Sequence, residues 1–141
     1  MQQVSASTSA KIPRSQALRS GALFDISEYG NPAGFQVPLA MTKAAWEASV
    51  TWSPEGAEMD ADADIQIARV KAVVNTAQDA VKARAGEADV TTLGTKVLVF
   101  TVSVRAELAA FRKAVHEVPM KLMLGRDDNN RFVLTIDLYQ E

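Results

Sequence analysis

The sequence predicts an α+β domain in which N-terminal helices, one of them long, pack on a C-terminal three-stranded antiparallel meander. Two observations carry this prediction. Between Ala63 and Val81, apolar residues recur every three or four positions, which is the period of one helix face. After residue 96 the period changes to two in three successive segments, as in half-buried strands. Because a meander must cover its apolar face, we expect the long helix to lie on it.

The start of the chain predicts only short elements. Residues 1–13 are rich in Ser, Thr and Gln and carry no periodicity, so we expect a flexible arm before a single domain over 14–141. Residues 14–21 suit a short helix that ends at a glycine, and 22–27 give a weak strand signal. Two glycines and a proline within 29–34 predict a turn.

Two further helices follow in the sequence. Thr42 suits the N-cap of the first, which should end near Trp52 because a Ser-Pro pair follows. The second is the long helix over 62–85, whose first turn carries carboxylates that favour the helix dipole, with charged residues such as Arg69 on its exposed surface. Its apolar stripe consists of Ala63, Ile67, Val70, Val74, Ala77 and Val81.

Three strands are expected in the C-terminal part, joined by a hairpin turn over 125–130, where Asn and Gly tolerate a positive φ. The helical spacing of Leu108, Phe111 and Val115 favours a short helix over 105–117, and an elongated hairpin tip is the alternative. The apolar faces of the three strands are formed by Leu98, Phe100, Val102 and Val104, by Val118, Met120, Leu122 and Leu124, and by Phe132, Leu134, Ile136 and Leu138.

The composition excludes several classes of function. A net charge of −2, from 15 basic and 17 acidic residues, gives no basic field for nucleic acid. The chain has no cysteine, and its one histidine, His116, allows neither a histidine dyad nor a zinc triad. The acidic run over 55–64 lacks the glycine and final glutamate of a calcium loop, so we expect no metal and no cofactor. Without an apolar run of about 18–20 residues or a signal peptide, we expect a cytoplasmic protein outside the membrane.

Basic residues in the strand connections are candidates for ligand or partner binding. Arg105, Arg112 and Lys113 belong to one connection, and Arg126 and Arg131 flank the next. Binding residues tend to collect in loops, and guanidinium groups suit a phosphate or an acidic protein surface. The two groups fall at opposite ends of the meander, so we expect only an oligomer to bring them together.

Two other side chains are candidates for the same site. Asp25 lies among apolar residues, so we expect it to be buried and satisfied by backbone N–H groups of the turn over 30–34; an acid–base role is the alternative. Trp52, beside the Ser-Pro pair, is the aromatic residue that we expect to be exposed.

Two blocks of the sequence carry a recurring order of residues. The first, over 14–52, contains Gln16, Ala17, Gly21, Asp25, Gly34, Phe35, Pro38, Thr42 and Trp46, and the second, over 119–138, contains Lys121, Gly125, Asp127, Thr135 and Ile136. In this order the chain resembles an uncharacterised bacterial family, a domain of unknown function carried mostly on plasmids, integrative elements and prophages. Ser20 stands where that family usually has an acidic residue, and 53–118 is similar only in layout. The resemblance implies a mobile-element origin.

These observations together lead to a functional hypothesis. We expect a non-enzymatic binding protein of a phage or mobile element that counteracts a host defence system, by occluding a protein component or by sequestering a nucleotide signal. The alternatives are a small enzyme that acts on a phosphate ester with Asp25 as the acid or base, and a nucleic-acid-binding regulator of element transfer. A helix–helix seam along the long helix would make the protein a homodimer.

Overall fold

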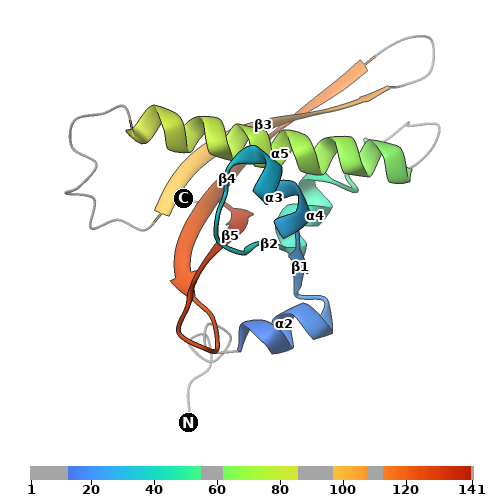
Figure 1. Ribbon diagram of the computed structural model, residues 1–141. Coiled ribbons are helices and arrows are strands. Elements are labelled where there is room, and N and C mark those ends of the chain that lie inside the picture. Colours follow the sequence, from blue (N-terminus) through green and yellow to red (C-terminus); the bar gives the residue numbers. More distant parts are fainter. Residues whose placement is uncertain (1–12, 55–61, 86–96, 108–112, 141) are drawn as a thin grey trace.

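The computed structural model describes residues 13–54, 62–85, 97–107 and 113–140, which form a five-stranded mixed sheet and four helices (Figure 1). The strand order is β1-β2-β5-β4-β3. Along the chain the elements are α2 (Arg14–Ser20), β1 (Leu23–Asp25), α3 (Ser27–Ala33), β2 (Leu39–Thr42), α4 (Lys43–Ser49), α5 (Ala63–Ala85), β3 (Val97–Glu107), β4 (Lys113–Arg126) and β5 (Phe132–Leu138). The α+β class is therefore as predicted, and the predicted arm over 1–13 lies almost wholly outside the described residues.

The sheet is larger than the predicted meander. Strands β3, β4 and β5 do form consecutive antiparallel pairs, but β2 adds to β5 in parallel and β1 adds to β2 in antiparallel. The sequence did not show β2 because Leu39, Ala40 and Met41 are all buried. A strand that is covered on both faces has no alternation of apolar and polar residues.

Helix α3 replaces the turn predicted over 29–34. Its glycines serve packing and termination within a helix. A Cβ at Gly30 would lie 3.1 Å from Cδ2 of Leu39, so Gly30 allows α3 to pack closely on β2. Gly34 ends the helix with a φ of 108°, and a Cβ there would lie 2.5 Å from Nε2 of Gln78 on α5. The glycines and the proline that are typical of a turn therefore belong here to a short helix that packs between β2 and α5.

The long helix α5 has the predicted bounds to within one residue. Asp62 caps it, because Oδ1 accepts a hydrogen bond from the backbone N–H of Ile65 at 2.9 Å. Its buried positions are Val70, Val73, Val74 and Ala77, which join Phe100, Val102 and Val104 of β3 in one core. Ala63 and Ile67, the first two residues of the predicted stripe, are exposed.

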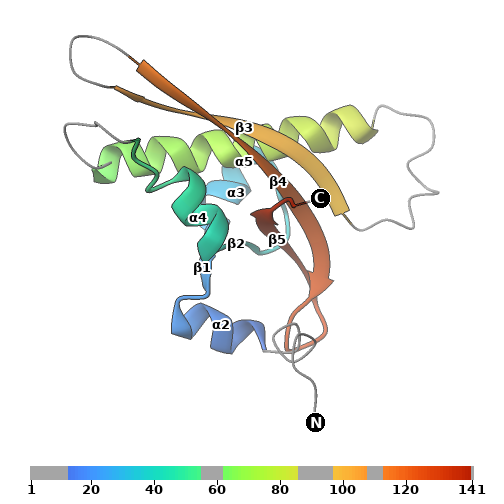
Figure 2. The same cartoon turned by 180° about the vertical axis from the view of Figure 1, so that it is seen from behind.

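The helix favoured over 105–117 is wrong for the described part of that segment. Register pairing of β3 with β4 is unbroken from Val97 with Met123 to Glu107 with Lys113, so both flanks are strand. Residues 108–112 lie outside the described part of the chain. Figures 1 and 2 show the end of this two-stranded ribbon projecting away from the helices.

Helices cover the two faces of the sheet unequally. The main core joins residues of α3, α4 and α5 to one face of the sheet, and we call this the inner face. On the opposite, outer face, Ala40 and Val133 are buried on the side where α2 packs beside β1. Figure 2 shows β3 and β4 from this side, with no helix over them among the described residues. Among the described residues, the outer face of β3 and β4 is therefore open.

Candidate functional site

The turn between β4 and β5 is held together by one aspartate. Oδ1 of Asp127 accepts hydrogen bonds from the backbone N–H groups of Asn129 and Arg131, both at 2.9 Å. These bonds stabilise the carboxylate, and the one from Arg131 contributes most to a lowered pKa of Asp127. Asn130 has a φ of 65°, as the predicted hairpin turn required.

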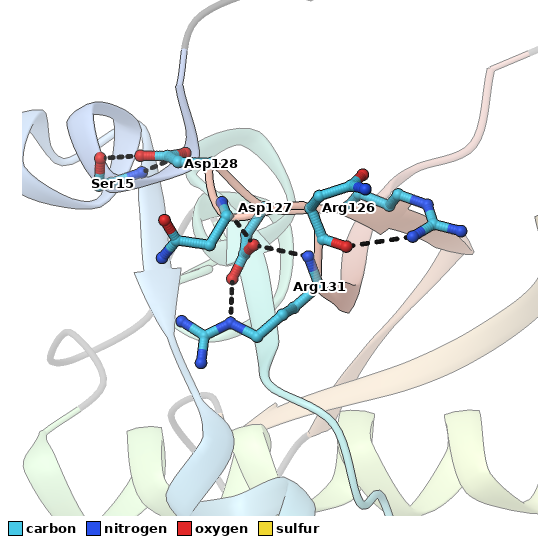
Figure 3. Close-up of polar contacts among 7 residues, drawn as sticks. Ser15, Arg126, Asp127, Asp128 and Arg131 are labelled. Carbon is cyan, nitrogen blue, oxygen red and sulfur yellow. Dashed lines mark hydrogen bonds and ion pairs between the residues drawn. The ribbon is translucent and has the colours of Figure 1, made fainter.

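This turn is also attached to helix α2 (Figure 3). The hydroxyl of Ser15 donates to Oδ2 of Asp128, and the backbone N–H of Ser15 donates to Oδ1 at 3.4 Å. The hydroxyl bond is the main cause of a lowered pKa of Asp128. The position of the turn is therefore fixed by α2, about 110 residues away in the sequence.

The two arginines of the turn do not converge on one point. Arg126 places its guanidinium carbon 4.2 Å from the ring centroid of Phe132 and donates from Nη1 to the carbonyl oxygen of Asn130 at 3.1 Å. Arg131 holds Nε 3.7 Å from Oδ2 of Asp127. Figure 3 shows the two side chains leaving the turn in different directions. A shared guanidinium fork for one phosphate is not formed in this arrangement.

Asp25 differs from its predicted environment. Its side chain is exposed, and Oδ1 accepts from the backbone N–H of Ser27 at 3.0 Å, at the start of α3. The nearby Arg14 donates to Oγ1 of Thr135 at 2.8 Å and to the carbonyl oxygen of Leu134 at 2.9 Å. Burial lowers the pKa of Arg14, while the charge of Asp25 opposes that shift. Asp25 therefore accepts a backbone hydrogen bond at the start of α3 and lies near a structural arginine.

Trp52 lies at the base of the β3–β4 ribbon and is only partly exposed. Its ring stacks on His116 of β4, with centroids 4.8 Å apart and planes inclined by 19°. The guanidinium carbon of Arg69 lies 5.9 Å from the same indole ring. Trp52 thus packs against other side chains of the protein and is not a free stacking platform.

Arg69 is the residue of this region that the sequence did not reveal. Its Nη1 donates to the carbonyl oxygens of Val50 at 3.1 Å and Trp52 at 2.6 Å, and its Nη2 donates to that of Arg105 at 3.0 Å. Burial lowers the pKa of Arg69. Sequence analysis placed Arg69 on the exposed surface of α5, whereas the side chain ties α5 to the end of α4 and to β3.

The other basic candidates lie at the end of the ribbon near Trp52, away from the β4–β5 turn. Arg105 and Lys113 are exposed, and Arg112 lies outside the described residues. Strand β4 separates Lys113 from Arg126 by its whole length, which is roughly 40 Å for an extended chain. The structure therefore keeps the two basic groups apart, as their places in the sequence predicted.

The open outer face is the broadest feature of the ribbon. Three of its valines are about half exposed: Val97 at 43%, Val99 at 45% and Val115 at 57%. Between them, the hydroxyl of Ser103 donates to the carboxylate of Glu117 across the strand pair. The outer-face side chains of β3 are Val97, Val99, Thr101, Ser103 and Arg105, and those of β4 are Lys113, Val115, Glu117, Pro119, Lys121 and Met123.

Two other features are absent from the described part of the chain. It contains no group of three or more His, Asp or Glu side chains that could hold a metal ion. None of its helices is both long enough and apolar enough to cross a membrane. Comparisons with protein-family models, with curated proteins and with solved structures found no match to this chain.

Proposed function

We propose that this protein is a non-enzymatic binding protein of a phage or other mobile genetic element, which counteracts a host defence system by occluding one of its protein components. The observation that carries the proposal is the open outer face of β3 and β4. Exposed valines stand there among hydroxyl and charged side chains. Protein interfaces combine apolar contact area with a polar rim in this way. The mobile-element context comes from the sequence resemblance.

The size of the face also suits a macromolecular partner. Eleven paired residues make a ribbon roughly 35 Å long and about 10 Å wide. A small ligand is normally enclosed in a concave pocket, whereas an extended ribbon surface suits a second protein surface. A specific protein interface buries about 800 Å² on each partner, so elements next to the ribbon, or a second ribbon, must contribute as well.

The proposal can be tested through paired substitutions on two surfaces. The protein is expressed in bacterial strains that each carry one defined defence system, and phage plating is measured. We expect plating to be restored in one strain and the matching defence component to copurify in a fixed ratio. Val99→Glu with Val115→Glu should abolish both effects, because buried carboxylates without partners are costly.

The matched control is Ile65→Glu, which places the same charge on an apolar residue of α5 that is 41% exposed. This variant should behave as the unsubstituted protein does. Restored plating that survives the double substitution, or that occurs without a copurifying component, would refute occlusion through the outer face.

A second candidate is the sequestration of a nucleotide signal at the β4–β5 turn. It is favoured by the exposed side chain of Arg131, which uses only Nε in its pairing with Asp127 and is 73% exposed. Native mass spectrometry of protein purified from a bacterial host tests it. A phosphate-containing adduct that is lost in Arg126→Ala and Arg131→Ala variants would support this candidate, and an apo species from cells with the active system would exclude it.

A further inference from the structure

Within the part of the chain that the structure describes, the outer edge of β3 is unusually open for a strand of its length. Strand β3 is last in the sheet order, and no described strand pairs with its far side. The other edge strand, β1, has three residues, whereas β3 has eleven. Natural proteins protect long edges with charges, prolines or bulges. The pairing of β3 with β4 has no bulge, and the segment 98–104 contains neither a proline nor a charged residue.

The open part of this edge has clear limits. At one end, the carbonyl oxygen of Arg105 already accepts a hydrogen bond from Arg69. Between the start of β3 and Arg105, the side chains alternate between the buried inner face and the exposed outer face. The available edge is therefore the seven-residue segment 98–104, and only its backbone groups and outer-face side chains are accessible.

We propose that this edge pairs in antiparallel with the same edge of a second copy of the chain, around a two-fold axis at Thr101. An antiparallel two-fold pairing places residues whose numbers sum to 202 opposite each other. On the accessible outer face, Val99 then lies opposite the partner's Ser103, and Thr101 lies opposite the partner's Thr101. Threonine pairs are a stabilising cross-strand combination.

A second copy fits this edge better than an unrelated strand because of where the charges lie. The segment 98–104 has no charge with which to select a charged partner strand. Arg105, at one end of it, would lie opposite the partner's Val97, so the two copies of Arg105 would be at opposite ends of the seam. A net charge of −2 per chain adds little repulsion between the copies.

The pairing has a consequence for the open outer face. A two-fold axis perpendicular to the sheet puts the outer faces of both copies on the same side, in one ten-stranded sheet. The area of ribbon that is open to a partner would then double. The inference does not depend on the proposed function, since it concerns the edge of β3 and the proposed function concerns the face.

The backbone edge alone is small. Seven residues on each copy form a seam roughly 24 Å long. Because this is less than a standard interface, we expect a dimer that dissociates on dilution, with a dissociation constant on the order of micromolar. Analytical ultracentrifugation of the full chain over a range of concentrations should show this equilibrium.

Complementary charges at the axis provide the decisive test. Thr101→Lys places two like charges directly opposite each other, so we expect dimerisation to weaken roughly tenfold. Thr101→Glu should weaken it in the same way. An equimolar mixture of the two variants should form heterodimers, because each lysine then lies opposite a glutamate. The control Val115→Lys changes the outer face of β4 and should leave the dimer unaffected.

Hydrogen exchange of the unsubstituted protein provides a test that needs no variant. Amides of 98–104 should exchange more slowly as the protein concentration rises, while those of β1 should not change. A chain that stays monomeric at every concentration overturns the proposal. So does a dimer that persists equally in both Thr101 variants, or one that forms without added protection of 98–104.

Discussion

The guanidinium of Arg69 donates to the carbonyl oxygen of Trp52 at 2.6 Å and also lies 5.9 Å from the centroid of the Trp52 indole ring. One side chain therefore fixes both the backbone and the ring of the residue that stacks on His116. Through its Nη2 bond to Arg105, the same guanidinium reaches β3. Arg69 thus joins the end of α4, the long helix and the base of the ribbon without the help of a carboxylate among the described residues.

Substitution of Arg69 should be costly. In Arg69→Met the apolar stem is kept, but the carbonyl oxygens of Val50, Trp52 and Arg105 lose their common donor. Each unsatisfied buried carbonyl costs about 1–3 kcal/mol, and water will reach some of them, so we expect a loss of about 2–4 kcal/mol. Urea denaturation measures the free energy of unfolding. Lys71→Met, at an exposed position of the same helix, should change it by less than about 0.5 kcal/mol.

The carboxylates of the β4–β5 turn should make stability depend on pH. The folded pKa values of Asp127 and Asp128 lie below their ordinary values, because both carboxylates accept hydrogen bonds. Groups with lowered folded pKa values stabilise the fold above their unfolded pKa of about 3.9 and lose this contribution as the pH falls below it. Replacement of both with asparagine should flatten the fall of the melting temperature between about pH 5 and pH 2. A melting profile as steep as that of the original protein would contradict this account.

Gly34 should resist replacement for two separable reasons. In Gly34→Ala the φ of 108° becomes strained, and the new Cβ would lie 2.5 Å from Nε2 of Gln78. We expect a loss of about 1–3 kcal/mol in the free energy of unfolding. Adding Gln78→Ala removes the collision but keeps the backbone strain. The double variant should therefore be more stable than the sum of the two single losses implies.

Trp52 should control the local stability of the ribbon base. Trp52→Ala removes the stacking partner of His116 and uncovers Arg69, so we expect a loss of about 2–4 kcal/mol. Hydrogen exchange should accelerate at 113–117 more than at β1 and β2. A uniform acceleration over the whole sheet would show that Trp52 acts on global stability rather than on the ribbon.

The parts of the fold that the sequence predicted are those with long, regular patterns. Helix α5 and the pair β3–β4 each repeat their period several times, so a stray residue such as exposed Ile67 does not hide the pattern. Strand β2 has four residues and is buried on both faces, which leaves no period to detect. Helix α3 was not predicted because Gly30 and Pro32 are residue types typical of a turn. In the structure, Gly30 instead allows α3 to pack closely on Leu39.

The candidate site was predictable only in part, because contacts between distant segments decide it. The separation of Lys113 from Arg126 followed from their places at opposite ends of one strand. The exposure of Asp25 did not follow from its apolar neighbours, since the side chain accepts a hydrogen bond from Ser27 at the start of a helix that the sequence analysis did not predict. Arg69 resembled any surface arginine of a helix, and nothing in its spacing shows that four backbone carbonyls lie beside it.

The parallel pairing of β2 with β5 joins segments that are about 95 residues apart, with β5 in the middle of the finished sheet. During synthesis, β1 and β2 are therefore made well before β5, the strand that joins them to the rest of the sheet. Until then, the apolar side chains of Leu39 and Met41 lack the neighbours that bury them. Pairings between such distant segments slow folding, and exposed intermediates attract chaperones or aggregate. Nascent chains that stop before residue 132 should thus be the aggregation-prone species of this protein.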